Sequence, residues 1–100
     1  MASYEEWLDA FQQAYRAPDR VSELACPNCG ARELRLRFVL YGNRGHEANA
    51  VFWCDSCLEG MPPGPSEVPA ACAPVRREDA HVPNYRIVPP TGQSERPSRP

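Results

Sequence analysis

The sequence contains no lysine: all 11 basic side chains among its 100 residues are arginine. Without lysine the chain cannot form a Schiff base with a carbonyl substrate and cannot supply the lysine of a P-loop, so these enzyme classes are excluded. An excess of positive charge is also missing, because 13 acidic residues give a net charge of −2. This balance argues against a general electrostatic affinity for nucleic acid or for anionic membranes.

Long apolar runs are absent too. The longest, Phe38 to Tyr41 and Ala50 to Cys54, are far shorter than the roughly 20 residues that a membrane-spanning helix needs. The opening stretch, MASYEEWLDAFQQAYR, has acidic and polar positions where a signal peptide needs a basic flank and an apolar stretch. These absences predict a cytoplasmic protein with no membrane contact, in a compartment where thiols stay reduced.

Proline is abundant but is concentrated in one part of the chain. Ten of the 12 prolines follow residue 60, so we expect residues 61–100 to form a largely extended or disordered tail outside the core. Within this tail only VPNYRIVPP (82–90) has the composition of a strand, and its flanking prolines restrict it to a sheet edge. The fold must then come from residues 1–60, and a domain this small is expected to need a metal or a cross-link.

An N-terminal helix is predicted within residues 1–20. Ser3 and Glu6 have the spacing of a capping box, Pro18 ends the helix, and the expected range is 4–16. Apolar side chains recur along one face of this helix at spacings of three and four: Tyr4, Trp7, Leu8, Phe11 and Tyr15. Because an isolated helix of this length is marginal in water, we expect the stripe to pack against the rest of the fold, with a partner protein as the alternative.

A β-hairpin is predicted within residues 21–60. Apolar residues at 34, 36, 38 and 40 alternate with Glu33, Arg35, Arg37 and Val39, which is the period of a half-buried strand. Residues 48–53 form the returning strand. The intervening YGNRGHE (41–47) contains glycine and asparagine, which tolerate the positive φ of a chain reversal.

Two Cys-x-x-Cys pairs flank this hairpin, in CPNCG (26–30) and FWCDSC (52–57). Two residues between paired cysteines allow a tight turn to present both sulfurs to one metal ion. Pro27 fixes φ in the first turn, and Gly30 permits a left-handed residue that directs backbone N–H groups toward the thiolates. The four cysteines Cys26, Cys29, Cys54 and Cys57 are therefore predicted to bind one structural Zn²⁺.

Three other uses of these cysteines have to be weighed. Disulfides need an oxidising compartment, which the sequence does not indicate, and a thioredoxin-like pair would open a helix rather than precede a strand. Iron in a rubredoxin-like site uses the same four ligands and stays open as an alternative to zinc. His46, His81 and Cys72 are predicted to play no part, because four cysteines already complete a tetrahedral site.

At these residues the chain resembles the zinc-ribbon family, in which two such cysteine turns, called knuckles, hold one structural zinc between β-hairpins. The resemblance covers residues 26 to about 60 and implies an antiparallel zinc ribbon, which with the helix makes a small α+β fold. The Cys-x2-Cys-x24-Cys-x2-Cys spacing is similar to that of the transcription-elongation-factor (TFIIS-type) ribbon. That subfamily has an Asp-Glu pair at the hairpin tip, where this chain has only Glu47 beside His46. A second departure is Leu58, which follows Cys57 where a glycine is common.

Two functions are compatible with this sequence. The first is a non-enzymatic adaptor that contacts a protein partner, because four protein ligands leave zinc no position for a catalytic water. The alternative is a nucleic-acid-binding or transcription-associated ribbon that would use Arg35 and Arg37 on the exposed strand face. Trp53, directly before Cys54, is expected to cover the metal site.

Overall fold

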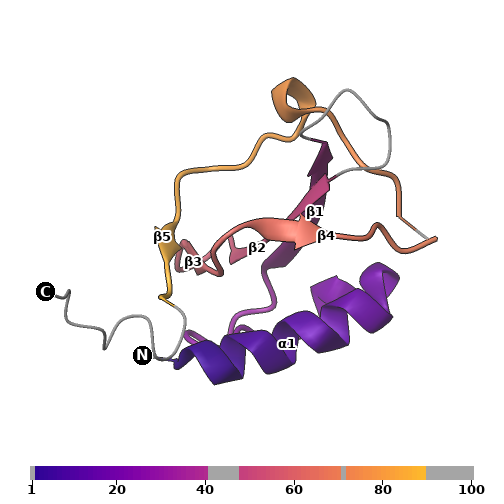
Figure 1. Cartoon of the computed structure of the whole chain (residues 1–100). Coiled ribbons are helices and arrows are strands. Elements are labelled where there is room, and N and C mark those ends of the chain that lie inside the picture. The colour runs from indigo at the N-terminus through magenta and orange to yellow at the C-terminus, as the bar shows by residue number, and fades with distance from the viewer. Residues whose placement is uncertain (1, 41–47, 71, 90–100) are drawn as a thin grey trace, which may run out of the picture.

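The computed structural model describes residues 2–40, 48–70 and 72–89. It has the predicted small α+β fold, with one N-terminal α-helix and a mixed, mainly antiparallel sheet (Figure 1). The elements are helix α1 (Tyr4–Arg16), strands β1 (Leu34–Leu40), β2 (Ala48–Cys54), β3 (Glu59–Gly60), β4 (Gly64–Ser66) and β5 (Arg86–Ile87), and the 3-10 helices η1 (Pro18–Glu23) and η2 (Arg77–Asp79). Among the described residues, no helix combines the length and the apolar character needed to cross a membrane.

Helix α1 has the predicted bounds and the predicted cap. The Ser3 hydroxyl accepts from the Glu6 N–H at 3.2 Å, and the Glu6 carboxylate accepts from the Ser3 N–H at 2.8 Å. Of the predicted stripe, Trp7 is fully buried with its ring edge-on to Phe52, at a centroid distance of 5.7 Å. The stripe therefore packs against the sheet, as expected. Ala10 and Ala14 complete the buried face of α1, which also lies against η1.

The predicted hairpin is formed by β1 and β2, which pair antiparallel from Leu34↔Cys54 to Leu40↔Ala48. Because side chains alternate along a strand, even-numbered residues face α1 and odd-numbered residues face the other side. The even-numbered apolar residues of β1 are largely buried, as the alternation predicted. The predicted turn at 41–47, with Arg44, His46 and Glu47, lies outside the described residues.

The chain after residue 60 differs from the sequence-based expectation. The described residues 61–70 and 72–89 are mostly extended, as predicted, apart from η2, but they pack against the ribbon. β4 pairs with β2, β5 forms within the predicted edge segment 82–90 and pairs parallel with β3, and Met61, Ala80 and Val88 are buried. Val75 exchanges two backbone hydrogen bonds of 2.8 Å with the outer edge of β1. A segment that pairs only at the edge of a sheet needs few backbone N–H donors, so a proline-rich segment can occupy this position. Residues 90–100 lie outside the described part of the chain.

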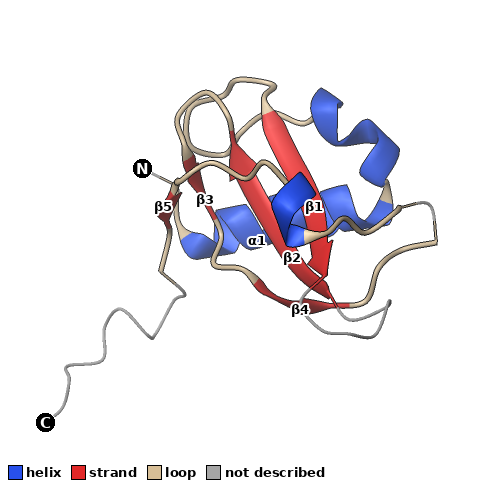
Figure 2. Ribbon diagram, turned by 90° about the horizontal axis from the view of Figure 1, so that it is seen from above, coloured by secondary structure: helices blue, strands red, loops and turns tan. Residues whose placement is uncertain are grey.

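The sheet is therefore covered on both faces (Figure 2). Helix α1 lies against one face, and the segment that contains η2 crosses the other face over β1 and β2. This arrangement gives β2 two buried faces, and five consecutive residues from Ala50 to Cys54 are buried.

Candidate metal centre

The first pair of cysteines lies in a tight turn between η1 and β1. The Cys26 N–H donates to the Ala31 carbonyl at 2.8 Å, and the Gly30 N–H donates to the Cys26 carbonyl at 2.9 Å. Gly30 has a φ of +82°, the left-handed conformation that glycine adopts without a steric penalty. The CPNCG sequence thus forms the knuckle that was predicted from its proline and glycine.

The second pair lies in a matching turn at the end of β2. The Leu58 N–H donates to the Cys54 carbonyl at 2.9 Å, as the Gly30 N–H does in the first knuckle. Leu58 also adopts the left-handed conformation, with a φ of +56°. The two knuckles therefore have the same backbone geometry, and Leu58 takes the position where the resemblance led us to expect a glycine. A non-glycine residue in this conformation is strained by about 1–2 kcal/mol.

The two knuckles bring all four predicted sulfurs together. The Sγ atoms of Cys26, Cys29, Cys54 and Cys57 all lie within 4.8 Å of one another. Across the two knuckles, Cys26 Sγ lies 3.8 Å from Cys57 Sγ, and Cys29 Sγ lies 3.7 Å from Cys54 Sγ. Zinc–sulfur bonds of about 2.3 Å in a tetrahedron place neighbouring sulfurs about 3.8 Å apart. The cluster thus has the size of a tetrahedral four-sulfur metal site.

Backbone N–H groups of both knuckles point at the sulfurs. The N–H groups of Asn28 and Cys29 donate to Cys26 Sγ at 3.3 and 3.4 Å, and the Ser56 N–H donates to Cys54 Sγ at 3.3 Å. Four thiolates and one divalent ion have a net charge of −2, and these donors stabilise that charge.

Burial and backbone hydrogen bonds shift the pKa values of three of these thiols in different directions. Desolvation raises the pKa of Cys26 to about 12 and also raises the pKa of Cys54, whereas the backbone N–H of Ala31 lowers the pKa of the exposed Cys29 to about 7. At neutral pH the buried thiols therefore hold their protons until a cation replaces them. A metal ion that binds at this site would therefore release protons, and its affinity would rise with pH.

Asn28 is a supporting residue that the sequence analysis missed. Its side-chain amide donates to Cys57 Sγ at 3.6 Å, which joins the first knuckle to a ligand of the second. Its side-chain oxygen accepts from the Ala2 N–H at 3.0 Å, just before α1. An asparagine inside a Cys-x-x-Cys turn can make such bonds, but its partners are distant in sequence and cannot be identified from the motif.

Asp55, within the second knuckle, is a further missed residue. Its carboxylate accepts from Trp53 Nε1 at 2.7 Å and from Arg35 Nε at 3.1 Å. Trp53 therefore does not cover the metal site as expected. It is an odd-numbered residue of β2, so its side chain points away from the face of Cys54 and stacks on Tyr85 at a centroid distance of 5.9 Å.

The remaining candidates from the sequence do not join the cluster. Within the described residues His81 is exposed and belongs to no group of potential metal ligands, and Cys72 packs half-buried against the core with a free thiol. Burial raises the pKa of Cys72, which disfavours the reactive thiolate. Scans against protein-family models, curated proteins and solved structures each find no match to this chain.

Proposed function

We propose that this protein is a non-enzymatic interaction module, which folds around one structural zinc ion and acts in the cytoplasm through contacts with a protein partner. The spacing of the four sulfurs is the main support, because it fits a closed tetrahedral site. A closed site leaves no coordination position for a water or a substrate, so the ion would hold the fold rather than catalyse a reaction. Metal binding of this kind contributes on the order of 10–16 kcal/mol to folding.

The two arginines of the nucleic-acid alternative are engaged within the protein. Arg35 forms ion pairs with Glu33 at 3.0 Å and with Asp55 at 3.1 Å. The guanidinium of Arg37 lies 5.8 Å from the centre of the Trp53 ring, in a cation–π contact. A phosphate would have to compete with these contacts, which favours the protein partner.

Metal analysis of the purified protein tests the structural part of this proposal. We expect one zinc per chain in the wild type and in Cys72→Ser, and none retained in Cys54→Ser. Cys72→Ser is the matched control, because it removes a thiol outside the cluster. Chelation should abolish the circular dichroism of the folded wild type. A visible absorption band with stoichiometric iron would contradict zinc, and an unchanged spectrum after metal loss would contradict a structural site.

Binding measurements separate the two partner classes. A single-stranded DNA or RNA probe should not shift in a gel at about 50 mM salt, where phosphate contacts are strong. Cross-linking in the native host should capture the same protein with the wild type and with Cys72→Ser but not with Cys54→Ser. Tight binding of the nucleic-acid probe that weakens with salt would overturn the proposed protein contact.

A further inference from the structure

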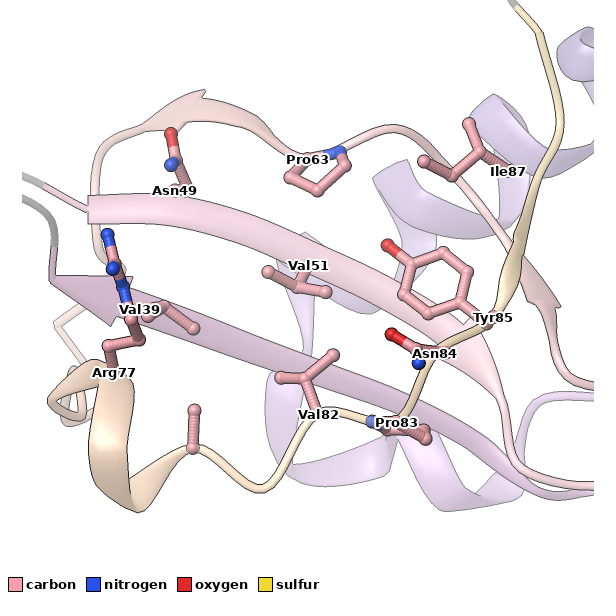
Figure 3. Close-up of a pocket in the computed structure, with 11 residues that line it drawn as sticks. Val39, Asn49, Val51, Pro63, Arg77, Val82, Pro83, Asn84, Tyr85 and Ile87 are labelled. Carbon is pink, nitrogen blue, oxygen red and sulfur yellow. The ribbon is translucent and has the colours of Figure 1, made fainter.

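The sheet face opposite α1 contains a groove of about 370 Å³. Figure 3 shows its construction: Val39 of β1 and Val51 of β2 form the floor, Val82 and Pro83 stand on one side, and Pro63 stands on the other. Tyr85 and Ile87 lie at one end, and Ile87 is 49% exposed, so it adds apolar surface to the groove. The groove, here called the tail groove, exists only because the chain after residue 60 packs on the sheet.

The opposite end of the tail groove is positively charged. Arg77 lies there together with Asn49 (Figure 3), and it is the only ionised side chain among the lining residues. Arg77 is exposed, and within the described residues it has no acidic partner. A ligand that fits this lining has an anionic group at one end and an aliphatic body over the valines.

Polar groups along the tail groove match a peptide backbone. The side-chain amides of Asn49 and Asn84 have no hydrogen-bond partner in the described part of the chain, and each offers both donors and an acceptor. Tyr85 donates its hydroxyl proton to the Met61 carbonyl at 2.7 Å, so its oxygen keeps lone pairs that can accept. Asn49 can bond to the peptide unit next to the anionic group, and Asn84 and Tyr85, at the other end of the groove, can bond to a peptide unit further along the ligand.

We propose that the tail groove binds the C-terminal residues of a partner protein that ends in an aliphatic side chain and a free carboxylate. The carboxylate pairs with Arg77, the last side chain packs on Val39 and Val51, and the preceding peptide units bond first to Asn49 and then, toward the other end, to Asn84. A peptide end fits better than a small free acid because the groove is open to solvent, whereas small-molecule sites bury about 70–90% of their ligand. This inference rests on the proposed function and identifies its partner.

Titration of a short peptide into the zinc-loaded, ¹⁵N-labelled full chain tests the proposal by NMR. The probe is acetyl-Gly-Gly-Leu with a free carboxylate, and we expect saturable shifts of the backbone amides at Val51, Arg77 and Asn84. The C-terminal amide of the same peptide should bind about tenfold more weakly, which corresponds to the roughly 1.4 kcal/mol of one charge-assisted contact. Arg77→Gln should weaken the free-acid peptide about tenfold too.

Arg76→Gln is the matched control, because it removes the same charge from the neighbouring residue, which does not line the groove. It should leave peptide binding unchanged. The proposal is overturned if the acid and the amide bind equally, if the two arginine variants behave alike, or if no saturation is seen up to roughly 10 mM peptide. Equal binding of 4-methylpentanoate, which is the last residue without its peptide nitrogen, would instead assign the groove to a small free acid.

The failure of this inference is distinguishable from the failure of the proposed function. If Arg77→Gln keeps its zinc and still captures the cross-linked partner, the interaction module stands and the tail groove is not its site. If the wild type holds no zinc, the proposed function itself fails.

Discussion

Alanine in place of Gly60 should destabilise this protein far more than alanine in place of Gly64. Both glycines lie in short strands that pair with β2, Gly60 opposite Trp53 and Gly64 opposite Ala50. Neither has a positive φ. The two substitutions therefore differ mainly in the space around the added methyl group.

At Gly60 the added Cβ would overlap the Phe52 carbonyl oxygen and lie 2.7 Å from both Cα and Cβ of Trp53. Backbone atoms cannot rotate away, so β3 would have to move. That movement would strain two hydrogen bonds, Met61 N–H to Phe52 O at 2.9 Å and Val88 N–H to Gly60 O at 2.8 Å. Overpacking in a core costs about 1–3 kcal/mol even where side chains can adjust, so we expect a loss of at least about 3 kcal/mol.

At Gly64 the added Cβ would meet nothing within 4 Å. Alanine there restricts the unfolded chain and should stabilise the protein by about 0.4–1 kcal/mol. Urea unfolding at one fixed concentration of free zinc measures both variants, because bound metal otherwise shifts the apparent stability. In thermal unfolding, the loss of about 3 kcal/mol at Gly60 corresponds to roughly 12–24 °C.

A Gly60→Ala protein within about 1 kcal/mol of Gly64→Ala would refute this reasoning. It would mean that β3 does not approach β2 as closely as the structure shows. The docking of the chain after residue 60, and with it the tail groove, would then also be in question.

Three further substitutions test other parts of the fold. Trp7→Ala should cost about 3–5 kcal/mol in urea unfolding because Trp7 is fully buried, and a loss below about 1 kcal/mol would show that α1 does not pack on the sheet. Leu58→Gly should raise the stability by up to about 1 kcal/mol at fixed free zinc, since it relieves the strain of a φ of +56° at a 42% exposed side chain, and a clear loss would contradict the strain. Burial raises the pKa of Tyr85 to about 12. The buried neutral phenol therefore stabilises the fold fully below pH 10, and this stabilisation is lost as the pH rises through about 12. Absorbance titration of the phenols should show one late tyrosine that disappears in Tyr85→Phe, and identical curves for the two proteins would refute the assignment.

The sequence predicts best those features whose causes are local. The capping box at Ser3, the end of α1 before Pro18, the alternation of β1 and the two knuckles all depend on residues within a few positions of one another. The contact between the two knuckles is also predictable, because one hairpin connects them. Each of these features is therefore recognisable from spacing alone, and the structure confirms them.

The docking of residues 61–89 depends instead on contacts between distant residues. Val75 bonds to the edge of β1, and the Arg86 N–H donates to the Leu58 carbonyl at 2.9 Å. Proline content indicates that this segment cannot form a helix or a central strand, but it does not distinguish a free tail from an extended chain on a sheet edge. Two signals indicated the docking. Residues 82–90 have the composition of an edge strand, and β5 forms within them. The odd-numbered β2 residues Val51 and Trp53 are apolar and need a cover on the face opposite α1.

The metal site and the tail groove are connected through β2. Cys54 ends this strand beside α1, while Val51 lines the groove and Trp53 lies on the same sheet face, so a one-residue slip of β2 would exchange the two faces. Asp55 opposes such a slip, because its N–H donates to the Glu33 carbonyl at 2.9 Å and its carboxylate pairs with Arg35 Nε of β1 at 3.1 Å. The second knuckle thus fixes the register of β2, and Trp53 in turn supports Tyr85 at the end of the groove. A metal ion that holds Cys54 and Cys57 against the first knuckle would therefore also maintain the shape of the groove. Removal of the metal should abolish peptide binding, even though none of the four cysteines lines the groove.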